Sequence, residues 1–282
     1  MEIKSYKCYN EKNELENDPK ILIKIQYGRM NSVIKYLAEF KSEFVEEYIQ
    51  HLKNRIKKAI QSIEKKEGMY DFLDLEEKFD FLDNYQELKK LTKEFTLKHL
   101  NPIKTKEEDP SIYLVLGFNR AIAFERLSYH RVKSFVELLG KEDGIKLYTK
   151  ILTQIQKDMK KGYQESDDVS ITKNRENSIE SWCKIGLCDF TYGVLDEHMD
   201  IYRFDKCFTH EVLKDFNDPD IAYYASCYQG DLPTRNDGLI ICMRRTQTLH
   251  HGDFCDELYW DSRIHKDPEQ PSLEFTRKLG RK

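Results

Sequence analysis

The sequence has no run of apolar residues near the ~18 that a membrane-spanning helix needs. Its first ten residues, MEIKSYKCYN, contain no apolar segment of the kind that a secretory signal requires. An excess of one charge is also missing, since 46 Lys and Arg against 50 Asp and Glu give a formal charge of −4. Such a balance gives no reason to expect binding to nucleic acid or to an anionic membrane. We therefore expect a cytoplasmic protein whose partner is a small molecule.

Several catalytic motifs are absent as well. The chain contains no Gly-rich phosphate loop, no GxSxG sequence and no HExxH sequence. Cysteine is present in odd number: of the seven Cys, six lie between residues 183 and 255. An odd count without a secretory signal predicts reduced thiols. The clustering indicates a thiol or metal site, although a single Cys is more often a small buried residue.

The 282 residues are enough to bury a substantial core, and the 12% of aromatic residues exclude a disordered chain. The patterns below predict an α+β fold, in which a helical N-terminal half packs against a mainly antiparallel C-terminal sheet with Cys-bearing helices. We expect a helical region over residues 1–110, an α+β core over 111–262 and an irregular tail over 263–282.

Apolar residues spaced three or four apart predict long amphipathic helices in the first half of the chain. The first is expected to follow a cap at Asn31 and to end near Gly68, and Pro102 should lie beyond the end of the second. A polar tract over 163–177 is expected to form a linker, followed by a short helix over 178–185. The four long helices are expected over 33–63, 75–100, 112–138 and 142–161.

The pattern changes after residue 186. The segments FTYGVL and MDIYRF are rich in β-branched and aromatic residues and predict a β-hairpin that turns at 196–198. Helical segments are expected over 207–216 and 219–227, and two further strands over 239–249 and 253–260.

The residues able to carry chemistry lie between 207 and 256, in CFTHEVLKDFNDPDIAYYASCYQGD and RRTQTLHHGDFCD. The features that stand out are Cys207, Pro219, Cys227, Asp231, Arg245, Thr246, Gly252, Asp253, Cys255 and Asp256. This pattern resembles the L-2-amino-thiazoline-4-carboxylic acid hydrolase family, and so does VELLGKEDGIKLYTKI at 136–151. The resemblance covers roughly residues 115–260, so it identifies the expected α+β core as hydrolase-like.

The resemblance implies hydrolytic opening of a small thiazoline ring to a carbamoyl-cysteine-type product. The reactive carbon of such a substrate is an amidine carbon between nitrogen and sulfur. Attack there needs a nucleophile, an acid for the departing heteroatom and anionic groups that hold the cationic amidine. The sequence thus predicts a hydrolase that acts on a C–N or C–S bond of a small heterocycle.

Four residues are the candidate catalytic groups. Cys227 and Cys255 are the candidate nucleophiles, because a thiolate is reactive and a nearby cation lowers its pKa. Asp231 and Asp253 are the candidates for the general base or for holding the amidinium. The residues expected to bind substrate are Arg245, Thr246, Cys207, Asp256 and Gly252.

The possible cations of this site are two arginines and two histidines. Strand alternation allows only one of Arg244 and Arg245 to point into the site, and the resemblance favours Arg245, which could bind a carboxylate in bidentate fashion. His250 and His251 are the other candidates. We expect Gly252 to be a turn glycine with positive φ.

Two alternatives stay open. The chain could be a relative of the same family that tailors a natural product, because family membership determines the scaffold better than the reaction. It could instead be a non-catalytic module in which Cys207, Cys227 and Cys255, with a His or Asp, bind Zn²⁺ or another divalent metal. No C-x₂-C pair supports the metal site. In either case the N-terminal helices could join copies of the chain in a homo-oligomer.

Overall fold

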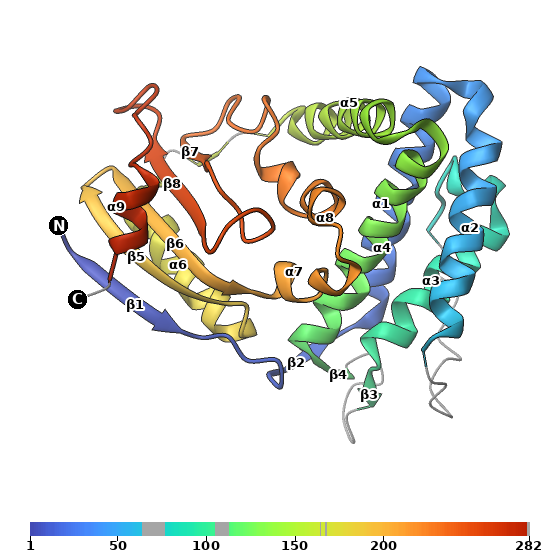
Figure 1. The fold of residues 1–282 in the computed structure, drawn as a ribbon, viewed down its shortest axis with the longest axis horizontal. Helices are drawn as coiled ribbons and strands as arrows, with labels where there is room; N and C mark the ends of the chain where they lie inside the picture. The colour runs from blue at the N-terminus through green and yellow to red at the C-terminus, as the bar shows by residue number, and fades with distance from the viewer. Residues whose placement is uncertain (64–76, 105–112, 164, 167, 281–282) are drawn as a thin grey trace. The chain divides into compact units, whose positions relative to one another are not determined.

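The computed structural model shows an α+β protein with its helices mostly in the N-terminal half and its larger sheet in the C-terminal half (Figure 1). This confirms the predicted fold class. The structure describes residues 1–63, 77–104, 113–163, 165–166 and 168–280. Contacts divide the chain into a sheet unit, residues 1–13 and 156–282, and a helical unit, residues 14–155. Within the described residues, no helix is both long enough and apolar enough to cross a membrane.

The helical unit is built from long helices that bury one apolar face each. Asp18 caps the first helix by accepting a hydrogen bond from the Lys20 N–H at 2.9 Å, and Pro19 occupies its first turn. The helices are α1 (Pro19–Phe40), α2 (Val45–Gln61), α3 (Gln86–Leu100), α4 (Gly117–Leu139) and α5 (Lys141–Lys160), with single turns η1 (Ser42–Phe44) and η2 (Leu82–Asn84).

The predicted helix over 33–63 is wrong, because the structure has two helices there. Lys41 adopts φ −159° and ψ 67°, which ends α1, and the chain then turns through Phe44 into α2. The apolar spacing continues across the break because Phe44 and Val45 are also buried, so the break leaves no sign in the periodicity. The last part of this helix, 64–68, and the predicted helix start at 75–76 lie outside the described residues.

A small sheet in the helical unit was not predicted. Its strands run in the order β2-β4-β3, and β4 replaces the first turn of the helix expected over 112–138. The run Tyr113–Leu116 pairs on both sides, so its alternate side chains are buried by neighbouring strands and the segment is extended. The strands are β2 (Glu14–Asn17), β3 (Ile103–Lys104) and β4 (Tyr113–Leu116).

The sheet unit contains a five-stranded antiparallel sheet in the order β1-β5-β6-β8-β7. The predicted hairpin is confirmed, with Asp196 paired to Met199 across its turn. The strands are β1 (Ile3–Lys7), β5 (Cys188–Asp196), β6 (Met199–Cys207), β7 (Ile241–Arg244) and β8 (Cys255–Asp261); the helices are α6 (Ile171–Ile185), α7 (Phe208–Glu211), α8 (Pro219–Ala225) and α9 (Leu273–Lys278), with single turns η3 (Lys214–Phe216) and η4 (Cys227–Gly230).

The two faces of this sheet carry different side chains. One face, here called the thiol face, holds the buried residues Cys188, Phe190, Tyr192, Tyr202, Phe204 and Cys255. Helix α6 covers it, and Trp182 packs edge-on against three of its rings. The opposite face packs Ile201, Leu258 and Trp260 against Leu279, the residue after α9.

Several boundaries differ from the sequence-based regions. Strand β1 belongs to the sheet unit because it pairs with β5, and most of α4 and α5 belongs to the helical unit, so the units do not follow the predicted regions 1–110, 111–262 and 263–282. Part of the expected linker lies inside α6, and α9 lies in the expected irregular tail. The strand expected over 239–249 ends at Arg244.

Cys8 and Cys183 form a disulfide across a sequence separation of 175 residues. The expectation of reduced thiols is therefore wrong for this pair. Cys8 directly follows β1, and Cys183 lies on the helix that covers the same face of the sheet. Their closeness comes from the pairing of β1 with β5, which no local sequence signal indicates.

Candidate active site

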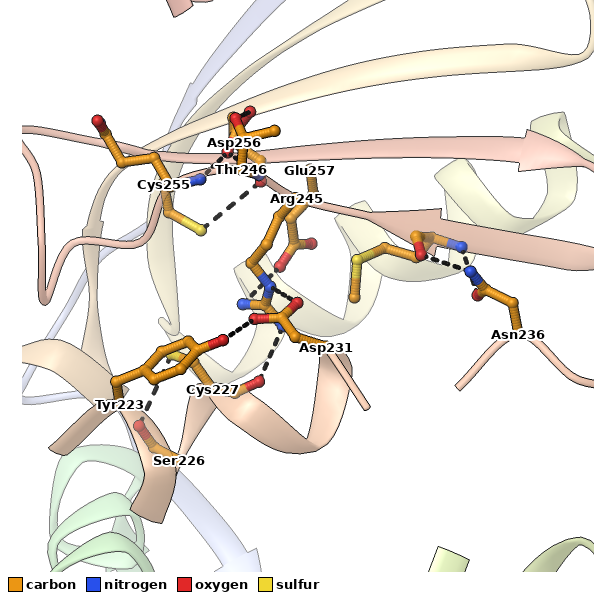
Figure 2. Close-up of polar contacts among 12 residues, drawn as sticks. Tyr223, Ser226, Cys227, Asp231, Asn236, Arg245, Thr246, Cys255, Asp256 and Glu257 are labelled. Atoms are coloured by element: carbon orange, nitrogen blue, oxygen red, sulfur yellow. Dashed lines mark hydrogen bonds and ion pairs between the residues drawn. The ribbon is translucent and has the colours of Figure 1, made fainter. Parts of the chain in front are cut away.

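The candidate site is organised around the guanidinium of Arg245, the first residue after β7, whose side chain is 10% exposed (Figure 2). Its Nε donates to Asp231 Oδ1 at 2.7 Å, and its Nη2 donates to the carbonyl of Cys227 at 3.1 Å. Nη1 lies 3.3 Å from Glu257 Oε1. Burial opposes the charge, but Glu257 and then Asp231 raise the pKa of Arg245, which stays fully charged.

The loop before β7 leaves space for the Arg245 guanidinium. A Cβ on Gly230 would lie 2.1 Å from Nη2 of Arg245, so only glycine leaves room for the guanidinium. Asn236 fastens the loop to β7, since its Oδ1 accepts from the Met243 N–H and its Nδ2 donates to the Met243 carbonyl, both at 2.9 Å. These contacts hold the loop, and with it Asp231, beside the C-terminal end of β7.

Asp231 is the titratable group best suited to proton transfer. Burial raises its pKa, while Arg245 and the Tyr223 hydroxyl, which donates to Oδ2 at 2.9 Å, partly offset that rise. A carboxyl group with a raised pKa can exchange protons near neutral pH more readily than an exposed one. The sequence analysis named Asp231 but missed Tyr223, eight residues earlier on α8.

Asp231 also borders a cleft of about 620 Å³. The cleft runs along the 230–239 loop and the end of β7, so it opens beside Arg245. Neither Cys227 nor Cys255 lines it. The charged residues along its wall are Asp231, Arg235, Asp237, Arg244, Arg245, Lys266 and Asp267.

Asp256 and Thr246 form a closed structural unit. The carboxylate of Asp256 is fully buried and accepts from the Thr246 N–H at 2.9 Å, the Thr246 hydroxyl at 2.6 Å and the Gln247 N–H at 2.7 Å. The amide of Gln270 donates to it at 2.8 Å. Both oxygens of Asp256 are therefore engaged in holding the loop after β7 on β8, which favours a structural role over substrate binding.

The thiols lie near one another but in different environments. Cys255 is buried on the thiol face, and burial raises the pKa of its thiol well above the usual range. Cys207 is paired with Cys188 across β5 and β6, and both Cys207 and Cys227 act electrostatically on Cys255. Among the described residues, no three His, Cys, Asp or Glu side chains are grouped so that they could hold a metal ion. The structure thus gives no support to the zinc site proposed from Cys207, Cys227 and Cys255.

The loop at 251–253 does not join the site. Asp253 is exposed and lies 3.3 Å from Arg277, whose hydrogen bond lowers the pKa of that carboxyl group. Gly252 does not have the predicted positive φ. A glycine fits here because of close packing: a Cβ at this position would lie 2.2 Å from the side chain of Gln247. His251 is exposed and contacts Asp220 at 3.1 Å.

His250 is buried, so its predicted role as a cation is wrong. Its Nε2 lies 3.2 Å from the hydroxyl of Ser226, at the end of α8. Burial, with a smaller effect from His210, lowers the pKa of His250 to about 3, so its imidazole is neutral at neutral pH. Of the two arginines, Arg244 pairs with exposed Asp267 at 2.9 Å, whereas Arg245 enters the site.

Glu257 is the other site residue that sequence reasoning missed. Its position two residues after Cys255 on β8 places both side chains on the same face, so strand alternation could have identified it. Comparison with known proteins adds no further assignment: no family model, no curated protein and no solved structure matches this chain. The resemblance to the thiazoline hydrolase family therefore stays a prediction.

Proposed function

We propose that this protein is a small-molecule hydrolase that opens a cyclic amidine or thiazoline-type amino-acid derivative by breaking a C–N or C–S bond. One observation carries the proposal: Asp231, a carboxyl group with a raised pKa, borders the 620 Å³ cleft, and Arg245 donates a hydrogen bond to its Oδ1. A carboxyl group so placed can exchange protons with a bound substrate. The resemblance in sequence supports the same class of reaction.

The charges of the cleft fit a zwitterionic substrate. Arg235 and Lys266 offer cations for a substrate carboxylate, and Asp237 offers an anion for an amidinium group. Arg244 is less suited to this role because it already pairs with Asp267. The volume lies within the range of about 300–1,000 Å³ that is usual for small-molecule sites.

In the proposed reaction, one water molecule adds to the amidine carbon. The ring C–S bond then breaks, and the departing sulfur takes up the proton that the water lost, which leaves a carbamoyl-cysteine-type product. Asp231 accepts that proton and returns it to sulfur. Tyr223 and Arg245 are positioning residues, since each bonds one oxygen of the carboxylate.

Cys227 is the alternative nucleophile in this scheme, although it does not line the cleft described above. Its thiol acts electrostatically on the Arg245 guanidinium, a neighbour of the kind that activates a cysteine. Cys255 is less suited, because burial keeps its thiol protonated. A covalent step at Cys227 would place the substrate sulfur or nitrogen as leaving group and return the free thiol by hydrolysis.

The test is turnover of 2-aminothiazoline-4-carboxylate by the purified full chain, followed as release of a free thiol. We expect Asp231→Asn to lower kcat/KM about 100-fold or more, the usual contribution of a general acid–base group. Cys227→Ser separates the two nucleophiles: an unchanged rate leaves water, and a comparable loss assigns attack to the thiol. Glu197→Gln, in the exposed hairpin turn, is the matched carboxyl control.

No turnover of the thiazoline by the wild-type chain would overturn the proposed substrate. Turnover of acyclic amidines or related derivatives in its place would favour the natural-product tailoring enzyme. Full activity of Asp231→Asn would remove the acid–base assignment even if the substrate were correct.

We also place this enzyme in the cytoplasm, as a homo-oligomer joined through its N-terminal helices. Ile21 and Ile25, exposed one turn apart on α1, support a contact there. The Cys8–Cys183 disulfide counts against the cytoplasm, where such bonds are rare. Alkylation of the chain in intact cells and its mass in solution test the two statements: two blocked cysteines or a monomeric mass would contradict them.

A further inference from the structure

Two cysteines of the sheet unit are direct cross-strand neighbours outside the disulfide. Cys188, on β5, is the partner of Cys207, on β6, and both carry thiols. The Phe208 N–H donates to the Leu187 carbonyl at 3.0 Å, which makes the two cysteines a non-hydrogen-bonded pair. The Cα atoms of such a pair lie about 4.5 Å apart, within the separation of about 4.4–6.8 Å that a disulfide spans. A bond between Cys188 and Cys207 therefore needs little movement of either strand.

Strand β1 brings a third cysteine to the other side of Cys188. β1 pairs antiparallel with β5 as far as Lys7, and the next position in that register sets Cys8 opposite Cys188. The Asn10 N–H donates to the Gly186 carbonyl at 3.0 Å, so the same register continues past Cys8. One cysteine from each of β1, β5 and β6 thus stands in a row across the sheet.

Helix α6 adds a fourth cysteine to this row. Cys183, near the end of α6, is bonded to Cys8. Cys8, Cys183 and Cys207 all pack against the buried cluster of the thiol face, which contains Cys188. Burial raises the pKa of the Cys188 thiol, so this thiol is mostly protonated at neutral pH and reacts slowly, but attack within the chain needs no access from solvent. A disulfide and a pair of thiols therefore share one end of the sheet.

We propose that these four cysteines form a thiol–disulfide exchange site, in which the bond between the β1 segment and α6 moves to the pair formed by Cys188 and Cys207. In the first step the Cys188 thiolate attacks the sulfur of Cys8, the existing S–S bond breaks, and Cys183 leaves as a thiolate that takes up the proton lost by Cys188. In the second step the Cys207 thiolate attacks the sulfur of Cys188, and Cys8 leaves and takes up the proton lost by Cys207. One disulfide and two thiols are present before and after, so the exchange needs no external oxidant or reductant.

The two states of this site differ in the elements that the disulfide joins. In the structure it ties the segment after β1 to α6, the helix that covers the thiol face. After the exchange it joins β5 and β6, which already pair along their length. The exchange therefore releases α6 from β1 without changing the order of the sheet. The site lies wholly within the sheet unit and does not depend on the proposed hydrolase.

The experiment maps the disulfides of the purified full chain by peptide mass spectrometry, after incubation without added thiol, acid quenching and alkylation. We expect the bond between Cys188 and Cys207 to appear as the bond between Cys8 and Cys183 declines, while the number of blocked cysteines stays at two. The initial rate should rise about tenfold per pH unit from about pH 7 to about pH 9, because the thiolate fraction of Cys188 rises in that proportion below its pKa. A chain that keeps the original bond alone at every pH would overturn the proposal.

Two serine variants separate the two steps. Cys188→Ser removes the first nucleophile, so the original bond should persist at every pH. Cys207→Ser should stop the exchange after the first step, so that the one new bond joins Cys8 and Cys188. If Cys188→Ser does not fold, the bonds of Cys207→Ser still decide, because a new bond that leaves out Cys188 contradicts the proposal.

Cys242→Ser is the matched control, since this cysteine is buried on the opposite face of the same sheet. It should exchange at the rate of the wild type. In the wild-type chain, any disulfide that includes Cys242 would show that the protein unfolds before its thiols react, which would overturn an exchange confined to the thiol face.

Discussion

Arg245 in the sheet unit and Arg131 in the helical unit are both largely withdrawn from solvent, but the fold gives them different partners. Arg245 is bonded by Asp231, a backbone carbonyl and, at 3.3 Å, by Glu257. Arg131 is bonded by one serine hydroxyl. Removing either charged guanidinium from water costs free energy. Two carboxylates offset this cost at Arg245, whereas Arg131 has no hydrogen-bonded carboxylate.

The difference follows from the elements that surround each arginine. Arg245 leaves the end of a strand, where a loop and the neighbouring strand β8 can each supply a carboxylate from a distant part of the sequence. Arg131 sits in the middle of a helix, where the facing helices supply aromatic side chains. The elements that pack around a buried cation therefore determine whether a carboxylate from a distant part of the sequence reaches it.

The first prediction compares the stability of Arg245→Met with that of Arg131→Met. Arg245→Met leaves the mostly buried carboxylates of Asp231 and Glu257 without their cation, and we expect it to lower the free energy of unfolding by about 3 kcal/mol. Arg131 has no hydrogen-bonded carboxylate, although Glu125 feels its charge, so Arg131→Met should cost less. Urea unfolding of both variants measures the difference.

Equal destabilisation by the two substitutions would break the comparison, because it would mean that Arg131 has a partner as strong as those of Arg245. The double variant Arg245→Met with Asp231→Asn is the control for the mechanism. It removes the stranded charge along with the cation, so part of the lost stability should return.

Much of the fold could be predicted because it depends on local patterns. The hairpin of β5 and β6, and helix α5, follow directly from alternation and from 3.6-residue spacing. The break at Lys41 and the strand β4 could not be predicted, since buried apolar residues continue through both. The Cys8–Cys183 disulfide also depends on long-range strand pairing, to which a single sequence gives no access.

The candidate site was only partly visible in the sequence for the same reason. Asp231 and Arg245 were named from the pattern that resembles the thiazoline hydrolase family, and the structure places Nε of Arg245 2.7 Å from Oδ1 of Asp231. Asp253 was named from the same pattern, yet its loop places it at the surface, 3.3 Å from Arg277. Distance along the sequence indicates which side chains are close within one strand or helix. It does not indicate where a side chain lies after the chain enters a loop.

Gly230→Ala tests how tightly the paired arginine is held. The added methyl would lie 2.1 Å from Nη2 of Arg245 and 3.0 Å from the methyl of Met243, so the guanidinium must move away from Cys227. We expect a loss of about 1–3 kcal/mol in the free energy of unfolding, the usual cost of overpacking. Gly238→Ala is unsuitable as a control, because the φ of +73° at Gly238 would strain an alanine. Asn236→Asp is the better comparison.

Asn236→Asp keeps the size of the side chain but removes its donor to the Met243 carbonyl, which loosens the same loop without touching the guanidinium. Stability equal to the wild type in Gly230→Ala would show that Arg245 has room to shift, contrary to the close packing described above. A loss in both variants, larger in Gly230→Ala, would support a site held from the loop and from the arginine together.

The last prediction concerns two buried histidines, one in each unit, whose pKa values are lowered alike, in contrast to the arginines. Burial lowers the pKa of His250 in the sheet unit and of His130 in the helical unit to about 3. Because the unfolded chain takes up these protons below pH 6.5 and the folded chain does not, each histidine lowers stability by about 1.4 kcal/mol per pH unit as the pH falls from 6.5 toward 3. His250→Gln and His130→Gln should each reduce that slope in urea unfolding, by similar amounts. If His250→Gln left the dependence of stability on pH unchanged, the His250 imidazole would be protonated in the folded protein. Its Nε2–H would then donate to the Ser226 hydroxyl.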